Sequence, residues 1–463
     1  MPVTGQLLPG VKVFTPYEVA NSLRFNSGSS DRLTRSFSAG SSTLWTWSGW
    51  IKRSKLGSRQ IIFSAYNSST YYTTMEFTAN DELKFNDENN NNTNGRIQST
   101  AKYRDPSAWM HIVFHWDSSD STSSDRLRMY VNNVRVTDFS DTGNAPSTGS
   151  QVNTAITHEI GSMNNSNFFE GYMCEVVFIN GANLDPDQFG EFDEDTGIWK
   201  PIDVSGSTFG TTGFYLDFKD SSSLGNDVSG NNNDWTVSNL TSIDQTTDTC
   251  SNNFMTLNPL STDSGVTLSE GNTESDFDAS VGNAKGNIGL TKGRWYWEVK
   301  LTNSTSGYPM IGIGSMNESQ MQKPTGGSYP GGFSNSYGVY GTNLRLYANG
   351  SNLGDQGSSY TTGDVFGIYL DLESSTKTIK WYKNGSSVLS YNITNAGDDY
   401  PFTCMDYNGG ESSVNVNYNF GNPAYTISSG NSDDNGYGNF EYSPNISSTK
   451  YYAVCTKNLA EFG

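Results

Sequence analysis

Apolar and polar side chains alternate along most of this chain with a period of two residues. The run Trp109–Trp116 (WMHIVFHW) places every second residue, from Met110 to Trp116, on one face. Ser42–Arg53 (STLWTWSGWIKR) alternates in the same way. A period of two is typical of strands that bury one face, whereas an amphipathic helix repeats every three to four residues. Because no run shows a helical repeat over ten or more residues, the pattern predicts strands throughout.

The predicted strands fall into two series. The first holds Ser42–Arg53, Arg59–Ala65, Tyr72–Thr78, Glu82–Asn86, Trp109–Trp116, Arg126–Val136 and Phe169–Ile179. The second holds Arg294–Leu301, Met310–Met316, Asp364–Leu372 and Thr378–Val388. Asn132-Asn133 and Asn384-Gly385 predict hairpin turns, since these residue types accept a positive φ.

The sequence therefore predicts an all-β protein of two antiparallel β-sandwich (jelly-roll) domains. The expected parts are an N-terminal arm at 1–22, a first sandwich at 23–199, a turn-rich connector at 200–254, a second sandwich at 255–421 and a polar tail at 422–463. The arm is assigned on its three prolines and its lack of periodicity. The connector is assigned on its Gly, Ser, Asn and Asp content.

Composition and charge narrow the classes of function. The 463 residues include 28 Lys+Arg against 48 Asp+Glu, a net charge of −20, so we expect no nucleic-acid partner, which would require a basic stripe. No apolar run approaches the roughly 18–20 residues of a membrane helix, and we expect no membrane insertion. The start, Met1–Gly5, lacks the features of a signal peptide, which predicts synthesis in a cytoplasm.

The first series resembles the laminin-G-like, concanavalin A-type jelly roll. The residues that carry this resemblance are Ser22–Phe25, Asp31–Leu33, Trp47–Lys52, Trp109–Phe114, Leu127–Asn132, Phe169–Tyr172 and Val177–Phe178. The second series resembles the SPRY domain, another β-sandwich. Here the matching blocks are Gly293–Val299, Ile311–Gly314, Tyr337–Gly338, Gly363–Asp371, Trp381–Gly385 and Asn419–Gly421.

This order of modules, with the run Leu224–Trp235 and the ending Tyr452–Leu459, resembles virion structural proteins of marine tailed bacteriophages. The resemblance implies a non-enzymatic virion protein made in the host cytoplasm, a tail fibre or surface adhesin that forms homo-oligomers. Its arm (1–22) would contact other virion proteins, and its sandwiches would attach to a host-surface glycan or receptor. A purely structural capsid-decoration or tail-assembly protein is one alternative, and a polysaccharide depolymerase is another.

Aromatic residues on loops are the usual platforms for sugar rings, and two groups are candidates. Tyr66, Tyr71 and Tyr72 lie in an Asn/Ser/Thr-rich loop. The SPRY resemblance, in which loops at one end bind partners, implies that Tyr329, Phe333, Tyr347 and Tyr407 are ligand contacts. Turn residues that cap the sandwich edge are the competing interpretation for both groups.

Acidic residues suggest two further kinds of site. Asp117, Asp120 and Asp125 cluster in one loop and are candidate ligands for a structural calcium ion, with a solvated loop as the alternative. Glu191–Asp195 is the best candidate for a glycosidase carboxylate pair. Because it follows the last strand of the first series, we expect these side chains at a turn on the rim and no enzymatic activity. Glu170 and Glu175 are at an odd spacing, which predicts opposite faces of their strand.

Histidines and cysteines add little to the predicted chemistry. His111 and His115 are four apart, which on a strand spans roughly 13 Å, too far to share a metal ion. His158 is the remaining histidine, and no G-x-S-x-G motif accompanies it. The four cysteines (Cys174, Cys250, Cys404, Cys455) are expected to be free thiols, mostly buried, with a Cys404–Cys455 bridge as the alternative.

Overall fold

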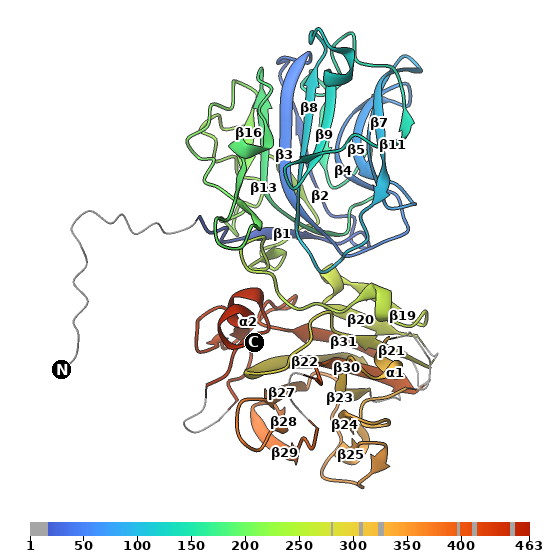
Figure 1. The fold of residues 1–463 in the computed structure, drawn as a ribbon, viewed down its shortest axis with the longest axis vertical. Coiled ribbons are helices and arrows are strands. Elements are labelled where there is room, and N and C mark those ends of the chain that lie inside the picture. Colours follow the sequence, from blue (N-terminus) through green and yellow to red (C-terminus); the bar gives the residue numbers. More distant parts are fainter. Residues whose placement is uncertain are drawn as a thin grey trace, which may run out of the picture.

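The structure, a computed structural model, describes residues 17–278, 281–304, 309–322, 328–395, 399–409, 414–444 and 450–463. Two β-sandwiches are stacked along the long axis of the molecule (Figure 1). The strand pairings within the sheets are antiparallel. The predicted fold class, two antiparallel β-sandwiches, is therefore confirmed.

The first sandwich consists of two facing sheets. One sheet has the order β10 (Val134–Arg135), β9 (Leu127–Val131), β8 (Met110–Asp117), β3 (Leu44–Arg53), β13 (Gly171–Asn180), β1 (Ser22–Phe25) and β18 (Gln245–Thr246), with β16 (Phe214–Leu216) also beside β13. The other has the order β11 (Phe139–Thr142), β7 (Asn92–Lys102), β6 (Glu82–Asn89), β5 (Tyr71–Phe77), β4 (Gln60–Ser68), β12 (Thr157–Ile160), β2 (Arg32–Ser36) and β17 (Thr236–Ser238). A separate ribbon pairs β14 (Gly190–Phe192) with β15 (Trp199–Pro201).

The second sandwich is built in the same manner. One sheet has the order β19 (Val266–Ser269), β20 (Glu274–Phe277), β31 (Val414–Asn419), β22 (Arg294–Ser304), β27 (Val365–Asp371), β28 (Thr378–Lys383) and β29 (Ser386–Asn392). The other has the order β21 (Val281–Lys285), β30 (Phe402–Gly409), β23 (Met310–Ser315), β24 (Ser336–Tyr340), β25 (Arg345–Ala348) and β26 (Ser351–Asn352). A short ribbon pairs β32 (Asn431–Ser432) with β33 (Asn439–Phe440).

Helices are few and short in the described part of the chain. The α-helices are α1 (Ser319–Gln322) and α2 (Thr456–Phe462). Single 3₁₀ turns occur at Ser123–Asp125, Pro186–Gln188, Pro259–Ser261, Glu270–Asn272 and Thr342–Leu344. The predicted absence of any helix of ten or more residues agrees with these bounds.

The alternation in the sequence correctly identifies the core faces. Met110, Ile112, Phe114 and Trp116 of β8 all lie in the core of the first sandwich. Both predicted hairpin turns are present: φ is +48° and +66° at Asn132-Asn133, and +48° and +77° at Asn384-Gly385. A buried face and an Asn- or Gly-containing turn are local properties, which is why the sequence predicts them.

The predicted domain boundaries need correction. The segment 200–254 is not a separate connector, because it supplies β16, β17 and β18 and buries Leu224 and Trp235 in the first core. The tail at 422–463 buries Tyr452 and Val454 in the second core. Of the arm, residues 1–16 lie outside the described residues. Val19 is buried, so the end of the arm belongs to the first sandwich.

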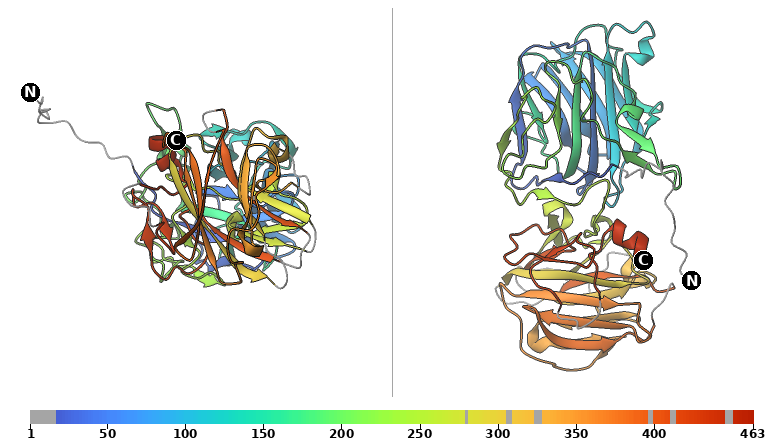
Figure 2. Two further views of the ribbon diagram at one scale, coloured as in Figure 1. Left: turned by 90° about the horizontal axis from the view of Figure 1, so that it is seen from below. Right: turned by 90° about the vertical axis from the view of Figure 1, so that its left-hand side faces the viewer.

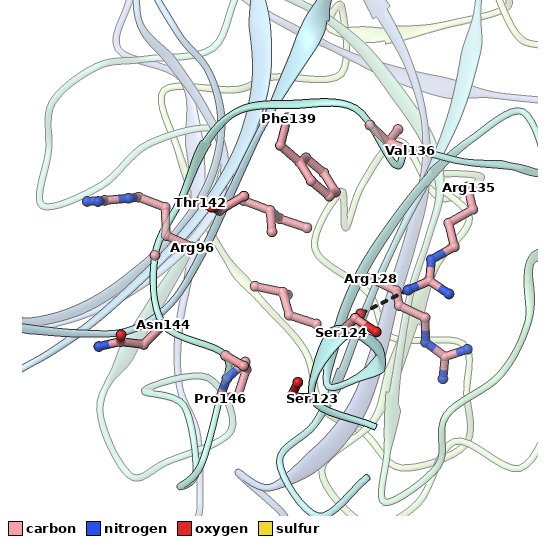
Figure 3. Close-up of a pocket in the computed structure, with 14 residues that line it drawn as sticks. Arg96, Ser123, Ser124, Arg128, Arg135, Val136, Phe139, Thr142, Asn144 and Pro146 are labelled. Atoms are coloured by element: carbon pink, nitrogen blue, oxygen red, sulfur yellow. Dashed lines mark hydrogen bonds between the residues drawn. The ribbon is translucent and has the colours of Figure 1, made fainter. Parts of the chain in front are cut away.

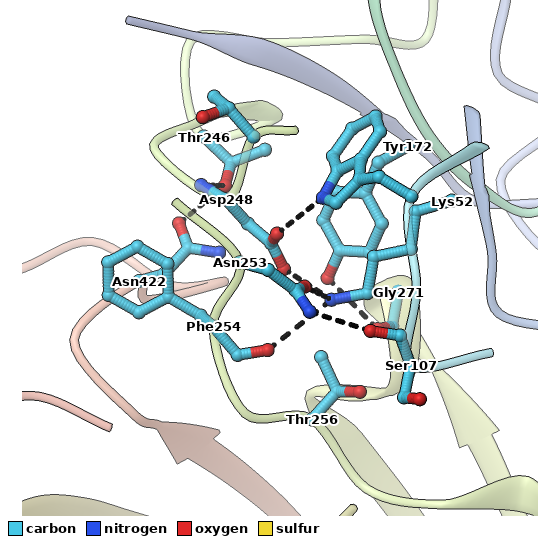
Figure 4. A network of polar contacts seen from close by, with 12 residues as sticks. Lys52, Ser107, Tyr172, Thr246, Asp248, Asn253, Phe254, Thr256, Gly271 and Asn422 are labelled. Atoms are coloured by element: carbon cyan, nitrogen blue, oxygen red, sulfur yellow. Dashed lines mark hydrogen bonds and ion pairs between the residues drawn. The ribbon is translucent and has the colours of Figure 1, made fainter. Parts of the chain in front are cut away.

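Buried polar contacts join the two sandwiches at the narrow region visible in Figure 2. Lys52 of β3 donates from Nζ to Asp248 Oδ2 (2.7 Å) and to Asn253 Oδ1 (2.6 Å), as Figure 4 shows. The Tyr172 hydroxyl donates to the carbonyl oxygen of Gly271 at 2.9 Å. Because Lys52, Asp248 and Tyr172 are buried, the junction is held by satisfied polar contacts rather than by a flexible linker.

Candidate binding surfaces

A hollow of about 250 Å³ opens between the edge strands of the first sandwich, where β9 and β10 of one sheet approach β7 and β11 of the other (Figure 3). Its apolar lining includes Ile97, Leu127, Val136, Phe139 and Pro146. The hollow reaches the core itself, because the first two of these residues are buried members of the core cluster. It therefore presents an apolar floor to any small group that enters.

Arginine side chains surround this hollow. Arg135 donates to the carbonyl oxygen of Ser124 (2.9 Å) and to Asp125 Oδ1 (2.6 Å). Arg96 pairs with Asp141 at 3.0 Å, and Figure 3 shows its guanidinium pointing away from the hollow. The side chains that face into the hollow are thus mainly apolar, and the charged guanidinium groups lie around its opening.

A second, shallower hollow of about 670 Å³ adjoins the first and shares Asn144 and Ala145 with it. The residues that line it carry no charge, and most are amides or hydroxyls: Asn89, Asn90, Asn92, Asn94, Asn144 and Thr148. We call the two together the rim site. Amide and hydroxyl groups both donate and accept hydrogen bonds, which suits a ligand rich in hydroxyls.

A buried carboxylate fixes the wall of the amide-lined hollow. Asp87 of β6 accepts hydrogen bonds from the Thr73 hydroxyl, from the Gln151 amide nitrogen at 2.9 Å and from Asn94 Nδ2 at 3.0 Å. Burial raises the pKa of this carboxyl above its usual range. Thr148 in turn donates to Asn94 Oδ1 at 3.0 Å, so the amides of this wall are held in place before any ligand binds.

The structure divides the first group of predicted tyrosines. Tyr71 lies opposite Asn89 in the β5–β6 pairing, at the edge of the rim site. Tyr66 and Tyr72 instead face each other across β4 and β5. All three are half-buried, and burial raises the pKa of Tyr72. None lines the rim site, which was missed by sequence reasoning because its residues come from separate loops.

Three of the four tyrosine and phenylalanine residues predicted from the SPRY resemblance meet in space. The ring of Tyr329 lies 5.4 Å from that of Tyr347 on β25 and 5.7 Å from that of Tyr407 on β30. All three are half-buried on one face of the sheet. The prediction of Phe333 as a ligand contact is wrong, because its side chain is buried against Met321 and Met405.

The predicted calcium site is not supported by the positions of its carboxylates. Asp117 accepts hydrogen bonds from Ser119, Asp120 accepts one from the Thr122 amide nitrogen, and Asp125 pairs with Arg135. Across the described ranges, no group of three or more His, Cys, Asp or Glu residues is arranged to hold a metal ion. Arg135 arrives from β10, a contact that spacing in the loop alone does not reveal.

The carboxylate cluster forms the turn of the β14–β15 ribbon. Lys200 Nζ lies 3.4 Å from Glu191 and 3.1 Å from Asp193. Hydrogen bonds from Thr196, together with Lys200, lower the pKa of Asp193 to about 2. Asp193 therefore caps an exposed turn, as predicted for this cluster. Glu170, whose partners include Lys55, lies apart from it.

A buried Ser48–His111 pair has the composition of a catalytic dyad but not its protonation. Ser48 Oγ lies 2.7 Å from His111 Nε2, while Trp199 Nε1 donates to Nδ1 at 3.1 Å. Because the indole can only donate, the neutral imidazole carries its proton on Nε2 and donates to the serine. Burial lowers the pKa of His111 to about 3, and His115 and His158 are shifted equally far.

The fold and these surfaces define a protein with two β-sandwich domains of binding type. Residues 26–187 match the family model of the concanavalin A-like lectin/glucanases superfamily, and residues 294–421 match that of the SPRY domain. The chain thus carries a laminin-G/concanavalin A-like domain followed by a SPRY domain. Among curated proteins, none matches the sequence significantly. Within the described residues, no helix has the length and apolar character to cross a membrane.

Solved structures are similar to parts of the chain at low identity. A human SPRY domain is 19% identical, covers 35% of this chain and 98% of its own, and has a TM-score of 0.28. The SPRY domain of human HERC1 is 17% identical, with coverages of 35% and 96% and a TM-score of 0.30. A heptameric SAP-like pentraxin from Limulus polyphemus is 16% identical, with coverages of 36% and 80% and a TM-score of 0.28.

Proposed function

We propose that this chain is a non-enzymatic attachment protein whose first sandwich binds a surface oligosaccharide at the rim site. The observation that carries the proposal is the shared wall of the two hollows, one apolar and one lined by amides and hydroxyls. A sugar ring has an apolar face and a ring of hydroxyls, so it requires both surfaces side by side. The apolar hollow is smaller than the ~300–1,000 Å³ typical of drug-sized ligands, which suits a single ring.

Two features support the non-enzymatic part of the proposal. Glu191 and Asp193 both pair with Lys200 at an exposed turn, whereas a glycosidase requires two carboxyl groups on either side of one sugar bond. His111 donates its proton to Ser48 instead of accepting one, so this pair lacks a general base.

We further propose that the protein is part of the virion of a tailed bacteriophage, displayed on a tail fibre or on the particle surface. The support is the sequence resemblance: the order of the two modules, the run Leu224–Trp235 and the ending Tyr452–Leu459. Since the Tyr17 hydroxyl donates to Glu175 and Val19 is buried, the segment that would contact other virion proteins lies before Tyr17. Removing residues 1–16 is expected to abolish incorporation into particles while leaving the melting temperature unchanged.

Binding of oligosaccharides from bacterial envelope polysaccharides to the full chain tests the proposed function. We expect Phe139→Ala and Asn144→Ala each to raise the Kd by about tenfold, which corresponds to a loss of about 1.4 kcal/mol of binding free energy. The matched control is Phe192→Ala, an exposed phenylalanine on β14 outside the rim site, which should bind like the parent protein. Absence of binding to every oligosaccharide, or equal effects of Phe139→Ala and Phe192→Ala, would overturn the site. Release of reducing ends would overturn the non-enzymatic assignment.

A further inference from the structure

Two thiols from distant parts of the chain meet outside the core of the first sandwich. Cys174 lies on β13, and Cys250 lies in the turn Thr249–Asn252, 76 residues later in the sequence. Their Sγ atoms are 3.6 Å apart. All four cysteines of the chain are free thiols, as expected, and the other two lie in the second sandwich.

Cys174 faces away from the core because it follows the core residue Met173 in the alternation of β13, and a β-bulge begins directly after it. Met173 and Val176 both belong to the core, so the two residues between them both point away from it. Glu175 takes up the extra residue with φ of +50°, and its carboxylate accepts hydrogen bonds from the Tyr17 and Tyr215 hydroxyls at 3.0 and 2.6 Å. The bulge thus turns Glu175 outward beside Cys174, which strict alternation does not predict.

The surroundings of the two thiols differ in their access to solvent. Cys174 is buried among Val19, Trp50 and Trp199, whereas Cys250 packs against the same cluster and is partly exposed. The turn that carries Cys250 is held by Val19, whose amide nitrogen donates to Ser251 Oγ and whose carbonyl oxygen accepts from Thr249 Oγ1, both at 3.0 Å. Of the two residues only Cys250 has surface exposed to solvent, so a dissolved reagent reaches Cys250 before Cys174.

We propose that Cys174 and Cys250 form a thiol pair that closes to a disulfide when the protein meets a small-molecule disulfide such as oxidised glutathione. Closure requires the sulfurs to approach by about 1.5 Å, from 3.6 Å to about 2.05 Å. Cys250 lies in the turn Thr249–Asn252 rather than in a strand of a sheet, so this movement does not require a strand to shift. Disulfides are rare in a reducing cytoplasm and persist outside it. On the proposed function, the two thiols are therefore reduced while the protein is in the host cytoplasm and become oxidised after the particle is released.

The reaction is an ordinary double exchange. The Cys250 thiolate attacks one sulfur of the small disulfide and expels a thiolate, which leaves a mixed disulfide on Cys250. The Cys174 thiolate then attacks Cys250 Sγ and expels the second thiolate. Two protein thiols are oxidised, the small disulfide is reduced to two thiols, and the two protein protons pass to the released thiolates.

Closure ties the junction to the sheet. The turn at 249–252 follows Asp248 and precedes Asn253, both of which hold Lys52 between the sandwiches. A bond from Cys250 to β13 therefore restrains this segment. In the unfolded chain the same bond closes a loop between residues 174 and 250, which lowers the conformational entropy of the unfolded state. We expect the oxidised protein to melt several degrees higher. Because burial raises the pKa of the Cys250 thiol well above its ordinary value, closure is expected to be faster at pH 9 than at pH 7.

The test uses the full-length reduced protein, incubated natively with oxidised glutathione, then alkylated in denaturant and digested for mass spectrometry. We expect a peptide that links Cys174 to Cys250, reversed by dithiothreitol, with Cys404 and Cys455 alkylated. Cys250→Ser should abolish both the link and the rise in melting temperature. The matched control Cys455→Ser should retain both, because serine suits the N-cap position that Cys455 occupies in α2.

Three outcomes would overturn the proposal. They are alkylation of all four thiols after incubation, glutathione retained on Cys250 without closure, and a link between Cys404 and Cys455 instead. Each is read from the wild-type protein, so the result does not depend on whether a variant folds.

Discussion

Replacement of Lys52 by methionine tests how the two sandwiches are held together. The Lys52 ammonium is 1% exposed, and its three donors have three acceptors: Asp248 Oδ2 at 2.7 Å, Asn253 Oδ1 at 2.6 Å and the Phe254 carbonyl oxygen at 3.3 Å. Methionine retains the length of the side chain but removes the charge and every donor.

The expected loss follows from the group left behind. Without the ammonium, Asp248 remains fully buried and keeps a single side-chain donor, Trp109 Nε1 at 3.0 Å. Breaking a buried ion pair on one side costs about 3–5 kcal/mol of stability. The control Lys55→Met removes a lysine that is 49% exposed and lies 3.5 Å from Glu170; this carboxylate keeps its hydrogen bond from the Ser27 hydroxyl, so we expect a loss of about 1 kcal/mol or less.

Urea unfolding at pH 7, followed by circular dichroism and tryptophan fluorescence, measures both variants. Because the pair joins the sandwiches, we expect the unfolding of both to shift in Lys52→Met. The double variant Lys52→Met/Asp248→Leu should recover part of the loss, since it removes the unpaired carboxylate as well. A loss in Lys52→Met below about 1 kcal/mol, or no larger than in Lys55→Met, would refute this account of the junction.

Three further predictions concern the second sandwich. Gly385→Val should destabilise it by about 1–3 kcal/mol in thermal melts, because φ is +77° and the new Cβ would lie 2.9 Å from the Tyr442 ring; an unchanged melting temperature would contradict this. Burial raises the pKa of Glu298 to about 7, so the folded state holds a proton that the unfolded state releases near pH 4.5. The stability from this group is therefore complete below pH 4.5 and lost as pH rises through 7, and Glu298→Gln should flatten the unfolding free energy over that range. Phe333→Ala should cost about 3–5 kcal/mol in urea unfolding and Tyr347→Ala clearly less, because only the former side chain is buried; the reverse order would restore Phe333 as a surface contact.

Interactions between neighbours in the sequence could be predicted without a structure. The alternation at Trp109–Trp116 indicates a strand and its buried face, and the pair Asn384-Gly385 indicates a tight turn, because both depend on the local backbone. The exposed turn at Glu191–Asp195 follows from its position after the last strand of the first series. The meeting of Tyr329, Tyr347 and Tyr407 followed from the resemblance of blocks spread along the second series.

Interactions between distant segments were decided by the tertiary structure. The polar stretch around Trp235 has the composition of a linker. It nevertheless completes the first sandwich, because its apolar residues Leu224 and Trp235 pack into the core formed by the other strands. Arg135 turns a candidate calcium ligand, Asp125, into half of an ion pair, and the turn Thr249–Asn252 brings Cys250 to Cys174 of β13. The sequence determines, through the chemistry of each side chain, which residues are stabilised by burial, by an opposite charge or by a turn conformation. Which partner each one meets depends on register and packing across hundreds of residues, and only the folded chain sets these.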